Sequence, residues 1–291
     1  MALPNDLLQN ITVTAEDGVV YPLRGGRPCS FMWLNGAGVA PIRRITQRSP
    51  LQDGVVDRGY RLNERQMTLG LYIPATSAYN ADQAREMLAY IFSPTTTPLK
   101  LTCTRLDGTV RQIDCYTNGT ISFEQSERSN GAQQVVVPLL ATDPTFYDPT
   151  QVVQTASLVS SPNDIFPNVT GMTAQDWPSI EVTGPVTSLE IFHGSVGETI
   201  VITGTIPALE TWRFDLRSGQ KTLKRVSDGA SRLTYVNTAN LAGFSTIQVR
   251  TEKEVRMMGA SPSLDTFTFS GVSTTAATSV SLKFYRRFLS L

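Results

Sequence analysis

The sequence predicts a mainly β protein: an N-terminal β domain that packs one α-helix, followed by an antiparallel β-sandwich. Short segments in which apolar and polar residues alternate recur along the chain, and this pattern is typical of strands with one buried face. Residues 80–92 form the one convincing helix. A proline-containing stretch at residues 135–149 separates two series of strands. The length of 291 residues agrees with about two domains.

Charge and hydropathy exclude several classes of function. The 25 basic and 25 acidic residues balance, which argues against a nucleic-acid or anionic-membrane surface. Charged residues make up 17% of the chain, below the roughly 25% that is typical, which suits packing beside copies of itself, although many enzymes share this composition. No apolar run reaches the roughly 20 residues of a membrane-spanning helix, and no secretory signal opens the chain. We expect no nucleic-acid partner, no membrane insertion and assembly in a cytoplasm.

An arginine-rich hairpin is predicted around Asp53-Gly54, between residues 42 and 72. Acidic residues interleave with its arginines, which disfavours a nucleic-acid interface. Two alternatives remain: a solvated hairpin, or an arm whose polar face contacts a neighbouring subunit. The apolar residues Met67, Leu69 and Leu71 alternate in the second arm, so that arm buries one face. The candidate subunit-interface residues are Arg43, Arg44, Arg48, Arg58, Arg61 and Arg65.

Residues 80–92 have the start, stripe and stop of an amphipathic helix. Asn80 is a suitable N-cap, and Gln83 occupies the capping-box position. Ser93-Pro94 ends the pattern. The apolar stripe, which we expect to pack against a sheet, consists of Ala84, Met87, Leu88 and Ile91.

A second hairpin is predicted at residues 99–116 around Asp107-Gly108. A three-residue loop ending at a left-handed Gly108 sets Leu99 opposite Cys115 and keeps the apolar residues on one face. Cys103 then lies too far from Cys115 for a disulfide. Because the number of cysteines is odd and no CxxC occurs, Cys29, Cys103 and Cys115 are expected to be free, mostly buried thiols.

The stretch at residues 135–149 predicts the last strand of the first domain and its rigid exit. Three valines favour a strand, and Pro138 suggests an edge or a bend because proline lacks the amide donor. Two Asp-Pro pairs flank Phe146 and Tyr147 and exclude a helix. We expect both rings to pack against the N-terminal domain and to form the domain junction. The expected divisions are 1–148 for the N-terminal domain, 149–176 for a connector and 177–291 for the sandwich.

Short strands at about 8–12-residue spacing predict the C-terminal antiparallel sandwich. Its expected strands span residues 179–182, 188–192, 199–203, 211–216, 232–235, 245–249 and 279–286.

No catalytic constellation stands out in the sequence. His193 is the single histidine, so a multi-histidine metal site is excluded, and a turn histidine is the simpler interpretation. Glu210 and Asp215 could form a glycosidase pair, and Trp212 could stack on a sugar, but strand alternation places Trp212 in the core and gives Asp215 the opposite face. We therefore expect that the protein is not an enzyme, that it has no catalytic residue, and that it binds no metal or cofactor.

The order of these features resembles the distal tail protein (Dit) family of long-tailed bacteriophages. Three parts of the chain carry the resemblance: residues 58–69 with the helix that follows, the exit at 143–147, and the start and end of the sandwich at 177–184 and 284–288. The resemblance implies a galectin-like sandwich and a hexameric ring, built by the N-terminal domains at the tail tip of the virion. It implies as partners the tail-tube protein and a tail-tip hub or fibre protein. The alternative is a carbohydrate-binding, lectin-like protein that acts in host attachment.

Overall fold

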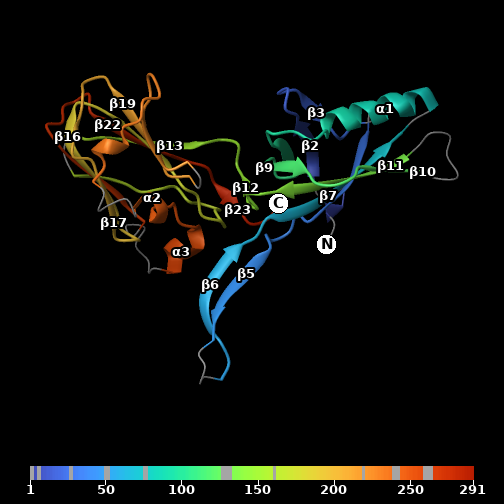
Figure 1. Cartoon of the computed structure of the whole chain (residues 1–291), viewed down its shortest axis with the longest axis horizontal. Helices are drawn as coiled ribbons and strands as arrows, with labels where there is room; N and C mark the ends of the chain where they lie inside the picture. The colour runs from blue at the N-terminus through green and yellow to red at the C-terminus, as the bar shows by residue number, and fades with distance from the viewer. Residues whose placement is uncertain are drawn as a thin grey trace. The chain divides into compact units, whose positions relative to one another are not determined.

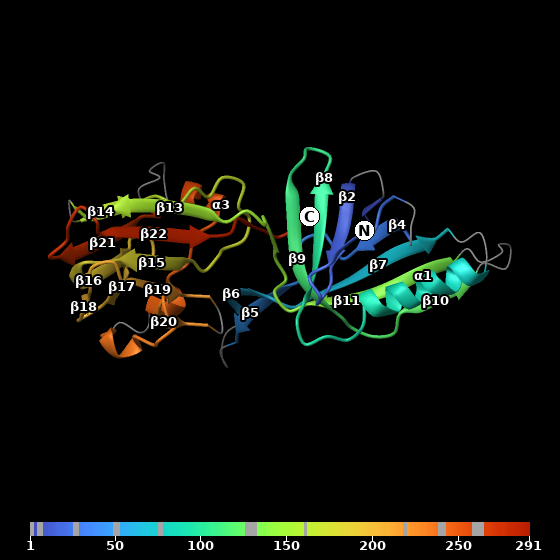
Figure 2. The same ribbon diagram turned by 90° about the horizontal axis from the view of Figure 1, so that it is seen from above.

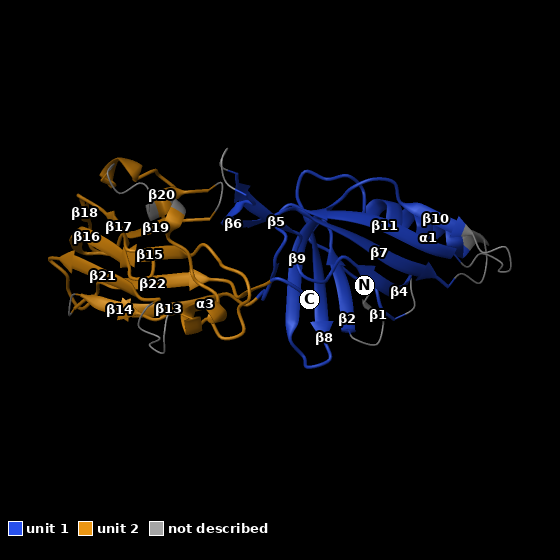
Figure 3. Ribbon diagram, turned by 90° about the horizontal axis from the view of Figure 1, so that it is seen from below, with its two compact units in different colours: residues 1–149, 289–291 blue, residues 150–288 orange. Residues whose placement is uncertain are grey.

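A computed structural model describes residues 3–4, 8–25, 29–48, 53–74, 78–125, 133–159, 162–217, 220–237, 243–257 and 265–291. The chain divides into two units, which Figure 3 colours separately. Unit 1 contains Met1–Pro149 together with Leu289–Leu291, and unit 2 contains Thr150–Phe288. The expected division placed residues 289–291 in the second domain, whereas their backbone hydrogen bonds to Ala37 and Ala40 tie them to unit 1.

Unit 1 is built on an antiparallel sheet with the strand order β1-β4-β7-β11-β9-β8-β2-β3. The short strand β10 (Ser122–Gln125) also pairs with β11, and β12 (Phe146–Tyr147) pairs with β9. The strands of the main order are β1 (Leu3–Pro4), β2 (Leu8–Thr14), β3 (Val20–Pro22), β4 (Ser30–Asn35), β7 (Arg65–Ile73), β8 (Leu99–Arg105), β9 (Val110–Thr117) and β11 (Gln133–Ala141).

Helix α1 (Ala78–Ile91) lies along β7 and β11 (Figures 1 and 2). Its buried positions Ala81, Ala84, Leu88 and Ile91 follow the helical period, and the Arg85 Nε atom donates to Gln133 Oε1 of β11 at 2.7 Å. The predicted helix and its packing on a sheet are therefore confirmed, with Met87 half-buried at the border of the stripe.

Strand β11 alternates strictly between buried and half-buried side chains, as expected for the strand before the exit. Pro138, however, lies in the interior of the sheet rather than at an edge, because β11 pairs with β7 along its whole length. On its other side β11 pairs with β10 up to Val136 and with β9 from Leu139 onward. Pro138 falls between these two partners, where the ladder does not require its missing N–H.

The hairpin of β8 and β9 has the predicted register. Leu99 pairs with Cys115 and Leu101 with Ile113, and Gly108 has a φ of 80° in the left-handed region. Cys103 pairs with Arg111, and all three cysteines are free and buried. Burial raises the pKa of each thiol to about 12.

Unit 2 is an antiparallel sandwich of two sheets. One sheet has the order β13-β22-β15-β19-β20, and the other has β14-β21-β16-β17 with β18 paired to β16. The strands are β13 (Val152–Ser157), β14 (Asn163–Ile165), β15 (Ser179–Thr183), β16 (Val186–His193), β17 (Glu198–Val201), β18 (Thr205–Ile206), β19 (Thr211–Asp215), β20 (Thr222–Arg225), β21 (Phe267–Val272) and β22 (Ser279–Phe284); the short strand β23 (Arg287–Phe288) follows.

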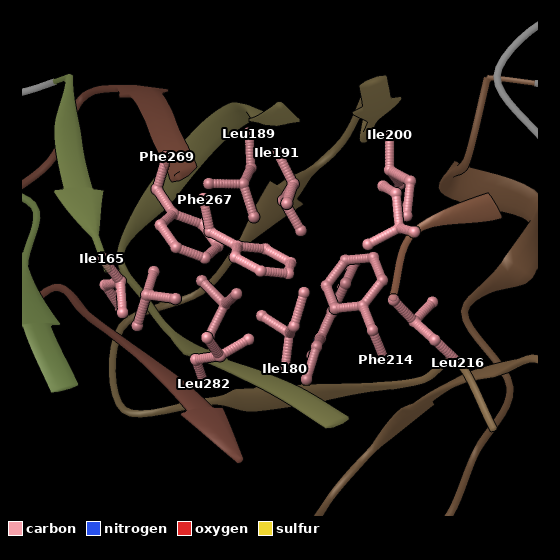
Figure 4. Packing of buried hydrophobic residues seen from close by; sticks show 14 of the residues in the cluster. Ile165, Ile180, Leu189, Ile191, Ile200, Phe214, Leu216, Phe267, Phe269 and Leu282 are labelled. Carbon is pink, nitrogen blue, oxygen red and sulfur yellow. The ribbon is translucent and has the colours of Figure 1, made fainter. Parts of the chain in front are cut away.

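The core of unit 2 forms where the inner faces of the two sheets meet. Ile180, Phe214 and Leu282 come from one sheet, and Phe267 and Phe269 come from the other; all are fully buried (Figure 4). The sandwich architecture predicted from strand spacing is thus confirmed.

Three expectations for unit 2 differ from the structure. The supposed connector at residues 149–176 contains β13 and β14, which pair with β22 and β21. The backbone at 233–235 forms a 3₁₀ turn, η2 (Leu233–Tyr235). Residues 245–249 begin within the helix α2 (Gly243–Thr246) and continue as irregular chain instead of forming a strand. In residues 245–249 the side chains of Ile247 and Val249 are buried, and Val249 forms a single β-bridge with Asp176. The alternation of apolar and polar residues therefore reflects burial and not the hydrogen-bond ladder of a strand. A further short helix is α3 (Glu252–Met257).

The three thiols should destabilise unit 1 at alkaline pH. Above pH 9 the unfolded thiols lose their protons while the folded ones keep them up to about pH 12, so each thiol lowers the free energy of unfolding by about 1.4 kcal/mol per pH unit. Chemical denaturation between pH 8 and pH 11 checks this. A variant with all three cysteines changed to alanine is the control, and equal pH dependence in both proteins would contradict the prediction.

Candidate functional site

The arginine-rich hairpin forms an arm of two strands, β5 (Ile42–Gln47) and β6 (Val56–Leu62). The two strands pair with each other in a sheet of their own and extend away from the main sheet of unit 1 (Figure 1). Every residue of β5 is exposed, and β6 is exposed except at the half-buried Gly59 and Leu62. A two-stranded hairpin is marginally stable in water by itself, so a covering partner would stabilise this arm.

Both strands of the arm expose apolar side chains. Ile42 is 52% exposed, and Tyr60, on the opposite strand, is 56% exposed. Scattered exposed apolar residues are ordinary on a protein surface, but these gather on one short hairpin. The exposed apolar residues of the arm are Ile42, Ile45, Val55, Val56 and Tyr60.

The arginines of the arm are mostly directed to solvent. Arg44 forms a salt bridge of 2.9 Å with Asp57, and Arg58 Nε donates to Gln47 Oε1 at 2.8 Å. Arg43 and Arg61 are register partners, so two like charges lie opposite each other across the strands. Such a pair is unfavourable unless an anionic group approaches it.

The arm and the remainder of unit 1 carry opposite charge. Residues 42–62 contain five arginines and two aspartates, a net charge of +3. The rest of unit 1 contains eight basic and twelve acidic residues, a net charge of −4. An arm of one copy is therefore electrostatically complementary to unit 1 of another copy.

Arg65 was predicted as an interface residue, and this assignment is wrong. Its side chain is buried at the start of β7, with 1% of its surface exposed. It shares the strand parity of Met67, Leu69 and Leu71, so the alternation in the sequence already placed it on the buried face. The other five candidates, Arg43, Arg44, Arg48, Arg58 and Arg61, are exposed.

The Arg65 guanidinium holds three segments of unit 1 together through backbone carbonyls. Its Nε atom donates to Pro144 O, Nη1 to Gly36 O and Gly38 O, and Nη2 to Leu289 O, all at 2.7 Å. The guanidinium carbon also lies 4.9 Å from the centre of the Phe146 ring. Burial lowers the pKa of Arg65 to about 10, so the group remains charged at neutral pH.

The exit residues pack within unit 1 as expected. Phe146 is fully buried beneath the Arg65 guanidinium. Tyr147 is half-buried, pairs with Gln112 of β9, and donates its hydroxyl to Asp114 Oδ1 at 2.7 Å. The Asp143–Pro149 segment is thereby an ordered part of unit 1.

The residues considered for catalysis occupy structural positions in unit 2. Trp212 is 2% exposed and donates Nε1–H to Glu210, so its ring is not available to stack on a sugar. Glu210 also forms salt bridges with Arg225 and Arg232, so its carboxylate is not a free acid. His193 is buried, and its Nε2 atom lies 3.0 Å from Asp265 Oδ1.

Among the described residues, no group of three or more metal-ligating side chains could hold a metal ion. No helix in the described ranges is long and apolar enough to span a membrane.

Residues 30–141 match the family model of the phage tail protein RIFT-related domain. The match runs from β4 to β11 and includes the arm, α1 and Arg65. This part of the chain is therefore similar in sequence to a phage tail domain. No curated protein sequence matches the chain.

Solved structures share the fold of nearly the whole chain. The Dit protein of phage SPP1, described as a paradigm of the hub adsorption apparatus in phages that infect Gram-positive bacteria, matches with a TM-score of 0.67 and 13% identity, covering 96% of this chain and 99% of that chain. A chain of the phage p2 baseplate in its activated conformation with calcium matches with a TM-score of 0.52 and 9% identity, over 97% and 99%. The resemblance to the Dit family is thus confirmed, by the family model for the tail domain and by the SPP1 Dit fold for the architecture.

Replacing Arg65 should destabilise unit 1 severely. Arg65→Ala leaves four carbonyls without their donor, and each such group costs roughly 1–3 kcal/mol when it stays buried, so we expect a loss of at least about 3 kcal/mol. Arg61→Ala, four residues away on the exposed arm, should stay within about 0.5 kcal/mol of the parent. Denaturant unfolding of both variants checks this, and similar stabilities would show that Arg65 is dispensable.

Proposed function

We propose that unit 1 of six copies forms a closed ring at the tip of a phage tail, which joins the tail tube to the baseplate or fibre hub. The tail-domain match at residues 30–141 and the shared fold with the SPP1 Dit protein support a structural role at the tail tip. The exposed, basic arm is the observation in this chain that carries the assembly step. Head-to-tail contacts between identical subunits produce a ring when their rotation closes.

In this proposal the arm of each subunit crosses to unit 1 of the next subunit. Its apolar side chains, including Ile42 and Tyr60, become covered, and Arg43 and Arg61 meet acidic or carbonyl groups. The opposite charges of the arm and the remainder of unit 1 favour this direction of contact and oppose contact between two arms. The ring would assemble in the host cytoplasm and then reside in the virion.

The proposed role is structural rather than catalytic. The further partners are the tail-tube protein on one side of the ring and a hub or fibre protein on the other. In the SPP1 and p2 structures the corresponding chains come from a hub adsorption apparatus and a baseplate, which supports partners of this kind.

The purified protein should form a particle of six subunits. Six copies of the 31.8 kDa chain give a mass of about 190 kDa. Mass measurement at several concentrations, with negative-stain imaging to count subunits, checks this. A protein that stays monomeric at every concentration, and that is also monomeric within isolated tail tips, would contradict the ring.

Removing or recharging the arm should abolish the ring while preserving the fold. Deletion of residues 46–58 should give a soluble, folded monomer, because the core of unit 1 lies in other strands. Arg61→Glu should weaken assembly at least tenfold through reversed charge. Lys224→Glu, an equal charge change at an exposed position of β20 in unit 2, is the control. Unchanged assembly of the deletion variant would show that the arm is a solvated hairpin.

A further inference from the structure

A polar pocket of about 240 Å³ lies on unit 2, on the outer face of the sheet that contains β15, β19 and β22. Alternate residues of these strands, such as Phe214 and Leu282, point into the core, so the pocket residues between them point outward. Its floor is formed by Ser179 and Glu181 of β15, Arg213 and Asp215 of β19, and Lys283 of β22.

The register of the sheet fixes the order of these side chains. Ser179 pairs with Lys283 on one side and with Asp215 on the other. In the adjacent row Glu181 pairs with Arg213. Because the central strand β15 is hydrogen-bonded on both sides, the donors and acceptors of the pocket stand on a rigid surface. A site on such a surface loses little entropy when a ligand binds.

Carboxylates and cations alternate across the pocket. Glu181 receives hydrogen bonds from Arg213 at 2.7 Å and from Lys283 at 2.6 Å, and Asp215 receives one from Arg217 Nε at 2.9 Å. With Asp176, three carboxylates and three cations line the pocket, so their formal charges cancel. The site thus presents many strong donors and acceptors without a net field that would select an ion.

Two aromatic side chains border the polar floor. Trp177 immediately precedes β15, is half-buried, and packs partly against the core of unit 2, which restrains its indole ring. Tyr285 follows β22 at the same end, where its backbone N–H donates to Asp176 Oδ2 at 2.7 Å. An aromatic ring beside polar groups can contact one face of a ligand while the polar groups fix the ligand's orientation.

We propose that this pocket binds one neutral sugar ring of a polysaccharide. Each hydroxyl of a sugar both donates and accepts a hydrogen bond, which matches alternating guanidinium and carboxylate groups. The apolar face of the ring can lie on Trp177. An anion would meet three carboxylates, and an apolar ligand would bury charges without partners, so both fit the site less well. The volume lies below the roughly 300 Å³ of the smallest drug-sized pockets, which suits a single ring.

The electrostatics favour binding over hydrolysis. Burial opposes ionisation of Glu181, but hydrogen bonds from Lys283 and Arg213 outweigh it and lower the pKa of that carboxyl. Burial likewise opposes ionisation of Asp215, and Arg217 outweighs it and lowers the pKa of Asp215. A glycosidase needs a carboxyl whose pKa is raised so that it can donate a proton, and these two carboxyls are shifted the other way.

Sugar titrations of the full-length protein test the proposal. The probes are glucose, galactose, rhamnose and N-acetylglucosamine, each followed by tryptophan fluorescence and saturation-transfer NMR. At least one should bind with a Kd on the order of 1 mM, as expected for a single ring in an open site. Binding should not change with salt, because the ligand is neutral.

Variants locate the site. Arg213→Ala should weaken binding at least tenfold, whereas Lys224→Ala, the register neighbour of Arg213 on the same face but outside the pocket, should leave it unchanged. Ser179→Phe fills the pocket without removing an ion pair and should cause the same loss, which keeps the test valid if Arg213→Ala folds poorly. Thermal melting monitors folding of each variant.

Three outcomes would overturn the proposal: no neutral sugar binds, binding survives in Ser179→Phe, or only anionic sugars bind and salt abolishes their binding. The sugar proposal does not depend on the ring. A monomeric protein that binds sugar would refute the ring alone, and a hexamer that binds none would refute the pocket alone.

Discussion

Unit 1 depends on one buried cation that has backbone carbonyls as its hydrogen-bond acceptors. A guanidinium with a carboxylate partner would gain more electrostatic energy, but Arg65 is surrounded by four carbonyls from the turn after β4, the exit segment and residue 289. The planar fork of arginine has donors in fixed directions, and this geometry lets one side chain position three segments that do not otherwise form a ladder together. Phe146 beneath the guanidinium completes the arrangement. The exit from unit 1 is therefore fixed by the same residue that begins β7.

The rigid and the exposed parts of unit 1 meet at that residue. Arg65 begins β7, which lies between β4 and β11 in the main sheet, while β6 ends at Leu62 with nearly all of its side chains in solvent. Within a few residues the chain passes from an uncovered hairpin to a strand with one buried face. A firmly anchored base allows an exposed arm to present its side chains in a defined direction, which would lower the entropy lost if a partner covered the arm as proposed.

Much of this architecture could be predicted from local pattern, and the failures have physical causes. The pairing register of the β8–β9 hairpin was predicted correctly, because only one loop length places the apolar residues of both strands on the same face. The position of Arg65 in the alternating pattern of its strand indicated that its side chain is buried, but its charge suggested exposure. Its hydrogen-bond acceptors are backbone carbonyls, which cannot be recognised from residue types in the sequence. Residues 245–249 alternate like a strand because Ile247 and Val249 are buried, although no neighbouring strand pairs along them. The pocket of unit 2 brings together Trp177, Arg213 and Lys283, whose proximity depends on strand order that spacing alone does not determine.

The return of residues 289–291 to unit 1 also determines when that unit can finish folding. Leu289 accepts hydrogen bonds from Arg65 and from the Ala40 N–H, and the Leu291 N–H donates to Ala37 O. During translation these residues leave the ribosome only after the whole sandwich has been synthesised. A nascent chain that lacks residues 289–291 therefore lacks the backbone groups that these residues supply to unit 1, including one acceptor of Arg65. Synthesis order in this way delays the fully stable form of unit 1 until the sandwich has been made.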